Sequence, residues 1–200
     1  MLKVGLTGSI AVGKSFVLNE LRQLGCVTLD ADKTARDVVE PGLPAFIEIV
    51  KNFGSGIITT DGSLDRSKLG AIVFNDLEKR ELLNSIVHPR VIEAQDRWLR
   101  EAEQAQPKGI AVVDAALMIE SGGYKRFDNL IVVWCEPAVQ LERLMSRNGL
   151  GRAEAEKRIG AQMSQEEKKA YADFLIDTSA KKEDTSKQTV EVFNKLKLLI

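Results

Sequence analysis

The chain has 200 residues, with 28 Lys and Arg against 29 Asp and Glu, so its formal net charge is -1. This balance argues against general nucleic-acid binding, and one histidine with two cysteines is too few for a usual zinc site. The apolar runs are shorter than the roughly 18–20 residues that cross a bilayer. We therefore expect a cytoplasmic protein with no membrane partner, either a monomer or a weak homo-oligomer.

The N-terminal segment predicts a strand, a glycine-bearing loop and a helix. Residues 2–7 form a short apolar run that suits a buried strand. Val17 and Leu21 belong to an apolar repeat at helical spacing, and Gly25 stands where that helix would end. A second strand is expected over residues 26–29. This βαβ pattern predicts a parallel sheet.

The middle of the chain, from residue 33 to 108, has a different and largely helical pattern. Helical patterns cover residues 43–50, 69–74, 77–87 and 91–102. His88 and Pro89 lie between the last two patterns, where the proline would begin a helix. Asp61-Gly62 indicates a turn. Because the stretch is long for one crossover, we interpret it as a helical insertion in the α/β core.

Strand-like runs return in the C-terminal half of the chain. They cover residues 110–113, 130–134 and 174–176, with helices expected over about 138–147 and 184–199. The predicted fold class is α/β, with a doubly wound, parallel, five-stranded sheet. We treat residues 1–200 as a single domain that carries the helical insertion and a small helical lid.

The most informative residues form a phosphate-binding loop. Residues 8–15 fit the P-loop pattern G-x-x-x-x-G-K-[ST]. Gly8 lets the chain turn off the strand, Gly13 permits close approach to phosphates, Lys14 reaches the β- and γ-phosphates, and the Ser15 hydroxyl can bind Mg²⁺. The flanking strand and helix favour ATP binding over a chance glycine-rich turn.

The class of P-loop protein follows from what the sequence lacks. A GTPase would carry a D-x-x-G switch, and no Asp in the chain is followed by Gly three positions later. A motor or an AAA-type ATPase would need a longer chain. These exclusions leave a small kinase that phosphorylates a metabolite.

Two carboxylates follow the second strand and a third closes a later strand. Asp32 is our candidate for the catalytic group that accepts or orients the proton of the acceptor hydroxyl, while Asp30 is the better candidate for a helix cap. Asp114 closes the strand over residues 110–113, where a carboxylate would lie near Mg²⁺. A turn-capping role for Asp114 stays open.

An arginine-rich segment around residues 143–165 predicts the lid. Its arginines are Arg143, Arg147, Arg152 and Arg158. Arginines on a closing segment can neutralise the transferred phosphoryl group and exclude water. Interleaved glutamates leave open that the segment is a solvated helix face. His88 is, by itself, more typical of a structural role than of a catalytic one.

The motifs together resemble the dephospho-coenzyme A kinase family. Besides the P-loop, the resemblance is carried by Asp30-Ala31-Asp32, Val39-Glu40-Pro41-Gly42, Val87-His88-Pro89, Gln140-Leu141-Glu142-Arg143 and Ala172-Asp173-Phe174-Leu175-Ile176-Asp177. It implies ATP-dependent phosphorylation of the ribose 3′-hydroxyl of dephospho-CoA, with Mg²⁺ as the metal. It also implies the P-loop kinase fold, with residues 33–108 as a helical substrate-binding insertion and residues 143–165 as a lid.

The resemblance assigns roles to individual residues. The implied catalytic residues are Lys14, Asp32 and Arg143. The implied ATP-binding residues are Gly8, Ala11, Val12, Gly13, Lys14, Ser15, Phe16, Arg143 and Arg147. The implied substrate-binding residues are Thr7, Asp32, His88, Leu117 and Glu120, and the implied metal ligands are Ser15 and Asp114.

Three positions depart from the family pattern. Ala11 stands where members commonly have glycine, Ala116 replaces a proline, and Thr178 replaces an asparagine near the expected adenine site. We interpret them as variation within the family. The alternatives to this reading are another small P-loop kinase, for a nucleoside, nucleotide or sugar acid, and a nucleotide-binding regulatory module without transfer chemistry.

Overall fold

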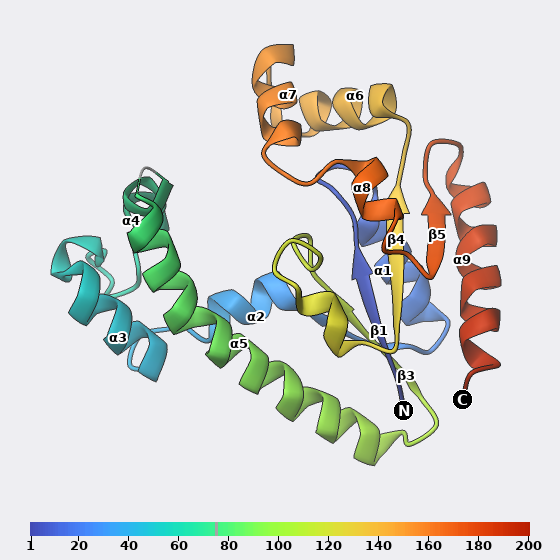
Figure 1. Cartoon of the computed structure of the whole chain (residues 1–200), viewed down its shortest axis with the longest axis horizontal. Coiled ribbons are helices and arrows are strands. Elements are labelled where there is room, and N and C mark those ends of the chain that lie inside the picture. Colours follow the sequence, from blue (N-terminus) through green and yellow to red (C-terminus); the bar gives the residue numbers. More distant parts are fainter. Residues whose placement is uncertain (75) are drawn as a thin grey trace. The chain divides into compact units, whose positions relative to one another are not determined.

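A computed structural model of the chain describes residues 1–74 and 76–200 (Figure 1). The chain forms two compact units. Residues 1–30 and 102–200 make up the first, which we call the sheet unit, and residues 31–101 make up the second, which we call the helical unit. Across the described ranges, no helix is both long enough and apolar enough to span a membrane.

The sheet unit is built on five parallel strands in the order β2-β3-β1-β4-β5. The strands are β1 (Leu2–Thr7), β2 (Val27–Asp30), β3 (Ile110–Asp114), β4 (Asn129–Trp134) and β5 (Phe174–Asp177). The predicted α/β fold with a parallel five-stranded sheet is confirmed. The strands were recognisable because β1, β3 and β4 are buried almost throughout, so that they read as continuous apolar runs.

β1 is the central strand of the sheet, with β3 and β2 on one side of it and β4 and β5 on the other. The loop that follows β1 therefore lies where the strand order reverses. Leu6 of β1 is in register with Asp114 of β3 and with Ile131 of β4. Ligands of open parallel sheets bind outside the carboxyl ends of the strands at such a point, and this is where residues 8–15 lie.

Helices α1 (Lys14–Gln23) and α9 (Lys182–Lys197) pack side by side and contact the sheet (Figure 1). The apolar face expected for α1 is observed, since Val17, Leu18 and Leu21 are buried. Gly25 has a φ of 101°, a conformation that favours glycine and that follows the end of the helix. The buried core that these elements share includes Leu2, Val4, Leu6, Val17, Leu21, Val112, Ile131, Val133, Ile176 and Leu196.

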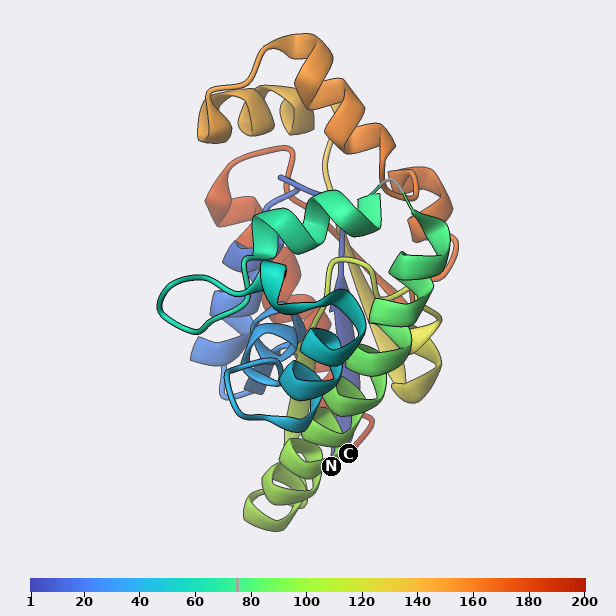
Figure 2. The same ribbon diagram turned by 90° about the vertical axis from the view of Figure 1, so that its left-hand side faces the viewer.

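Beyond the carboxyl end of β4, three helices precede β5. They are α6 (Pro137–Asn148), α7 (Arg152–Gly160) and α8 (Gln165–Lys169). Figures 1 and 2 both show α6 and α7 side by side as a helical hairpin. Gly149 ends α6 in the left-handed region with a φ of 63°, and Gly151 is the N-cap of α7, so glycines form the predicted break between two helices. That the hairpin acts as a lid stays a prediction.

The helical unit has a core of its own. Its helices are α2 (Ala31–Asp37), α3 (Pro44–Phe53), α4 (Arg66–Phe74) and most of α5 (Leu77–Ala105), with a short 3-10 turn, η1 (Ser55–Ile57). The core includes Val39, Ala45, Ile49, Ile57, Leu64, Leu69 and Ile86. A second 3-10 turn, η2 (Gly123–Arg126), belongs to the sheet unit.

The prediction of two helices separated at His88-Pro89 was wrong, because α5 runs through the proline. A proline inside a helix removes one backbone hydrogen bond and costs about 3 kcal/mol. Buried residues anchor both halves of α5, with Ile86 before the proline and Leu99 after it. We infer that this packing offsets the cost of the proline.

The turn predicted at Asp61-Gly62 is confirmed. Gly62 has a φ of 86°, and a carboxylate oxygen of Asp61 accepts hydrogen bonds from the Thr59 hydroxyl and, at 3.0 Å, from the Ser63 N–H. These hydrogen bonds lower the pKa of Asp61 to about 2, and the bond from Thr59 has the largest effect. An antiparallel bridge between Ile58 and Leu64 closes the turn.

The buried face of α1 gives a test of the packing. We expect Leu21→Ala to lower the free energy of unfolding by about 2–5 kcal/mol, because a fully buried leucine leaves a cavity when truncated. The matched control, Leu199→Ala, removes a half-exposed side chain and should change the free energy by less than about 0.5 kcal/mol. Urea unfolding measures both, and equal effects would contradict the described core.

Candidate functional site

The P-loop joins β1 to α1 through two left-handed residues. Ala11 has a φ of 63° and Gly13 a φ of 88°. Within the described ranges, Ala11 is the one residue other than glycine with a positive φ, a conformation that costs an alanine about 1 kcal/mol or more relative to glycine. A side chain at Gly8 would lie 2.5 Å from the Val133 carbonyl oxygen, so the start of the loop requires glycine.

The N-terminus of α1 has no side-chain cap among the described residues. Gly13 is the N-cap, and no described side chain caps this helix or places an acid in its first turn. The free backbone N–H groups and the helix dipole at such an end favour a phosphate. Ser15 lies in the first turn and is exposed, while Phe16 is half-buried, with the Lys182 ammonium 5.8 Å from its ring centre.

Lys14 and Asp114 are brought together as an ion pair. Both side chains are largely buried, with exposures of 15% and 8%. Asp114 is the last residue of β3, in register with Asp30 of β2, so the strand ends place its carboxylate beside the P-loop. Attraction between charges is stronger here than at an exposed surface because less water screens it.

Arg143 of α6 does not point into solvent. Its guanidinium donates to the Thr178 hydroxyl at 3.0 Å and to the Thr178 carbonyl at 2.7 Å. The same hydroxyl donates to the Val12 carbonyl oxygen at 2.6 Å. Thr178, which follows β5 and is buried, therefore links Arg143 to the P-loop.

The other lid arginines fit the solvated-face alternative better. Arg152 pairs with Glu156 at 2.8 Å, and Arg158 pairs with Glu154 at 2.6 Å, each one helical turn apart. These pairs are exposed, so each contributes little to stability. Arg147 is also exposed and donates to the Asn148 side chain at 2.9 Å. A phosphate-binding role for Arg147 stays a prediction.

The loop after β3 is tied to α8 by a buried lysine. The Lys168 ammonium bonds the Ala116 carbonyl at 2.8 Å and the Glu120 carboxylate at 2.8 Å. Ala116 also accepts from the hydroxyl of the fully buried Thr7, at 3.3 Å. A buried ammonium is stable only when paired and hydrogen-bonded. Lys168 therefore fixes the segment that carries Leu117, whose side chain is exposed.

Two predicted site residues, Asp32 and His88, belong to the helical unit. Asp32 lies in the first turn of α2 and is exposed. His88 lies within α5, also exposed. Their assignment to the substrate site stays a prediction.

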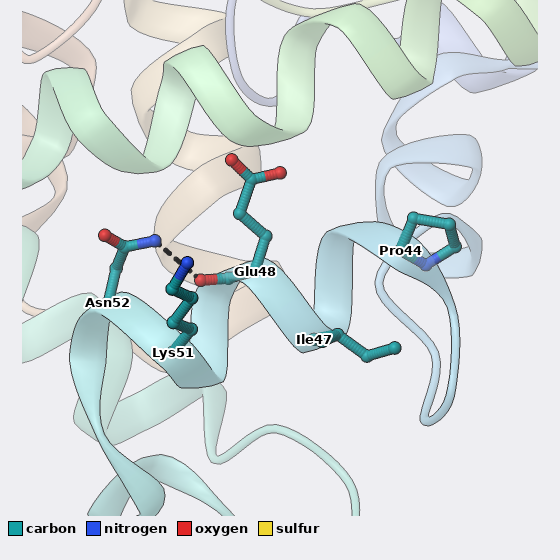
Figure 3. Close-up of a pocket in the computed structure, with 5 residues that line it drawn as sticks. All are labelled: Pro44, Ile47, Glu48, Lys51 and Asn52. Carbon is teal, nitrogen blue, oxygen red and sulfur yellow. Dashed lines mark hydrogen bonds between the residues drawn. The ribbon is translucent and has the colours of Figure 1, made fainter.

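The helical unit also has a shallow groove along α3 (Figure 3). It is lined by Pro44, Ile47, Glu48, Lys51 and Asn52. The Asn52 amide donates to the Glu48 carbonyl at 2.8 Å, within one helix. None of the residues predicted for the site lines this groove.

Sequence reasoning missed Gln162 and Lys168, which contact the P-loop and the loop after β3 respectively. Gln140 was named only within a motif, Thr178 only as a departure from a pattern, and Gln165, which bonds Gln140, was not named at all. The one local signal is the capping box of α8, in which Ser164 and Glu167 bond each other's backbone. The bonds from Ser164 lower the pKa of Glu167. This box predicts where α8 begins but not which of its side chains are buried.

Comparisons with known proteins agree with one another. The family model described as dephospho-CoA kinase matches residues 2–184. A dephospho-CoA kinase of Listeria innocua is 48% identical over 189 residues, covering 94% of this chain and 93% of that protein.

Solved structures extend the similarity to the fold. A dephospho-CoA kinase from Campylobacter jejuni has a TM-score of 0.74 at 27% identity, covering 98% of this chain and 96% of that one. The crystal structure of TT1252 from Thermus thermophilus has a TM-score of 0.81 at 30% identity, covering 98% and 97%.

The Thr178 link predicts a measurable effect. Thr178→Val removes the hydroxyl that donates to Val12 and accepts from Arg143, which leaves both groups without this partner. We expect the free energy of unfolding to fall by about 1–3 kcal/mol. Thr178→Ser keeps the hydroxyl and should lose less than half as much. Chemical unfolding compares the two, and equal losses would show that the hydroxyl does not matter.

Proposed function

This chain belongs to the dephospho-CoA kinase family, and from that premise we propose which of its residues carry out the reaction and where a metal ion assists it. The activity of the family is ATP-dependent phosphorylation of dephospho-CoA at its ribose 3′-hydroxyl, the final step of coenzyme A biosynthesis. The observation that carries the residue assignment is the Lys14–Asp114 pair beside the left-handed P-loop turn.

ATP binds with its phosphates in the P-loop. The loop segment from Ala11 to Phe16 and the α1 N-terminus supply N–H donors for the β- and γ-phosphates, apart from the N–H groups of Val12 and Phe16, which bond backbone carbonyls of the loop. Lys14 exchanges its contact with Asp114 for the phosphate oxygens, because two or more phosphate charges compete with one carboxylate. Arg143, held by Thr178 beside Val12, adds positive charge at the edge of the same loop.

One residue of α1 and one at the end of β3 also fit a magnesium ion. The Ser15 hydroxyl and the Asp114 carboxylate are oxygen donors, which Mg²⁺ prefers. Within the described chain, no group of three or more His, Cys, Asp or Glu side chains could hold a metal. Mg²⁺ is usually bound by one or two protein ligands together with substrate phosphates and water, so this sparse set suits it. When bound, it would neutralise phosphate charge during transfer.

In the transfer step, the 3′-hydroxyl oxygen of dephospho-CoA forms a bond to the γ-phosphorus, and the bond to the β-phosphate oxygen breaks to release ADP. We assign to the Asp32 carboxylate the role of accepting the hydroxyl proton. Thr7, His88, Leu117 and Glu120 are proposed as the remaining substrate-site residues. Glu120 would act through the loop after β3, since its carboxylate is bonded to Lys168. Lid closure by the α6–α7 hairpin would exclude water from the site.

The substrate assignment is tested by ADP release. We expect the purified chain with ATP and Mg²⁺ to release ADP when dephospho-CoA is added, and not with nucleosides, gluconate or shikimate. Turnover with a member of that panel and none with dephospho-CoA would identify a different small kinase. No turnover with any acceptor would favour a nucleotide-binding module.

The role of Asp32 is tested by removing its charge. Asp32→Asn should lower kcat by about 10²–10⁴-fold, the usual contribution of a positioned base, with the KM for ATP little changed. Asp37→Asn is the matched control, because Asp37 is an exposed aspartate of the same helix. If steady-state kinetics show Asp32→Asn within twofold of the control, Asp32 is not the base.

A further inference from the structure

Both backbone polar groups of one P-loop residue are held by glutamine side chains. The Ile10 N–H donates to the Gln162 side-chain oxygen at 2.8 Å. The Ile10 carbonyl accepts from the Gln140 side-chain nitrogen, also at 2.8 Å. The two peptide planes that flank Ile10 are therefore both fixed, and the second of them leads directly into Ala11.

We call these two hydrogen bonds the clamps of Ile10. The clamp on the carbonyl side, from Gln140, is supported by further hydrogen bonds. Gln140 is 2% exposed, and its side-chain oxygen accepts from the Gln165 amide at 2.8 Å. Gln165 in turn accepts from the Cys135 N–H at 2.9 Å, just beyond β4. This chain of bonds sets which end of the Gln140 amide faces Ile10, because its oxygen is already engaged.

The clamp on the N–H side comes from the segment after α7. Gln162 follows Gly160, the last residue of α7, and the neighbouring Met163 carbonyl accepts from the Ser9 hydroxyl at 3.4 Å. Met163 itself donates its N–H to the Glu120 carboxylate at 3.3 Å. The backbone next to Gln162 is therefore bonded to the loop after β3, and this holds Gln162 in place.

The residue beside the clamps is the strained one. Ala11 has a φ of 63°, and a non-glycine residue keeps such a conformation only where its surroundings determine it. The φ of Ala11 is a rotation relative to the peptide plane between residues 10 and 11, and Gln140 holds the carbonyl of that plane. Without the clamps, the chain would be free to relax towards the common conformations with negative φ.

We propose that Gln140 and Gln162 are positioning residues for ATP. They hold the left-handed turn at Ala11, so that the N–H groups that follow it converge on the phosphates before ATP arrives. The inference rests on the proposed binding of ATP phosphates by this loop. Gln140 precedes the lid segment and Gln162 lies near its end, so the clamps also tie the shape of the P-loop to both ends of the lid.

A double-mutant cycle with Ala11→Gly tests this role. Gln162→Ala should raise the KM for ATP about tenfold, which corresponds to the cost of a left-handed alanine, and leave the KM for dephospho-CoA within about twofold. Glycine adopts the turn without that cost. Introduced together with Ala11→Gly, the same Gln162→Ala should raise the KM for ATP by less than about threefold relative to Ala11→Gly alone. Gln140→Ala should follow the same pattern.

The control is Gln104→Ala, which removes an exposed glutamine of α5 and should change neither KM. Equal effects of Gln162→Ala with and without Ala11→Gly, or no effect at all, would overturn the proposal. Gln162 is only half-buried, so its variant carries the test if the Gln140 variant does not fold. Calorimetric titration with ATP alone gives the same cycle in Kd, so a failure to phosphorylate dephospho-CoA would refute the proposed function and leave the clamp measurable.

Discussion

The backbone between β1 and α1 has to pass through left-handed conformations at Ala11 and Gly13, and the P-loop site depends on this turn. Neither Ala11 nor the chain beside it favours this shape unaided. Contacts from two other strands support it, since Asp114 closes β3 and Thr178 follows β5, and Val133 of β4 leaves room only for glycine at residue 8. The parallel sheet is what brings these strand ends to one edge.

Charge at this edge is paired. The net charge of -1, from 28 Lys and Arg against 29 Asp and Glu, does not show where opposite charges meet. In the structure two largely buried lysines, Lys14 and Lys168, each have a carboxylate partner. Burying such pairs costs desolvation energy that their attraction only partly returns. Their value lies in geometry: one pair holds Lys14, which we propose binds phosphate, and the other fixes the loop after β3.

Local signals predicted most of the fold, because strands buried on both faces and glycine-bearing turns leave a direct mark on the sequence. The P-loop motif likewise predicted the loop between β1 and α1 and the glycine with which it begins, Gly8. Long-range contacts were not predictable in the same way. Lys168 lies in the run QEEKK, which is typical of a solvated helix. It is buried because it contacts the loop after β3, some 50 residues earlier in the chain. Pro89 was misread for a similar reason, since packing on both sides of it keeps α5 continuous.

The protein itself holds the P-loop turn before ATP binds. Amide hydrogen exchange at Ile10, measured by NMR on the ligand-free chain, reports whether the turn is formed without the ligand. Because this N–H is bonded to Gln162, we expect it to exchange at least ~100-fold more slowly than in an unstructured peptide. Exchange at the unstructured rate, with protection only after ATP is added, would show that the ligand and not the protein shapes the loop.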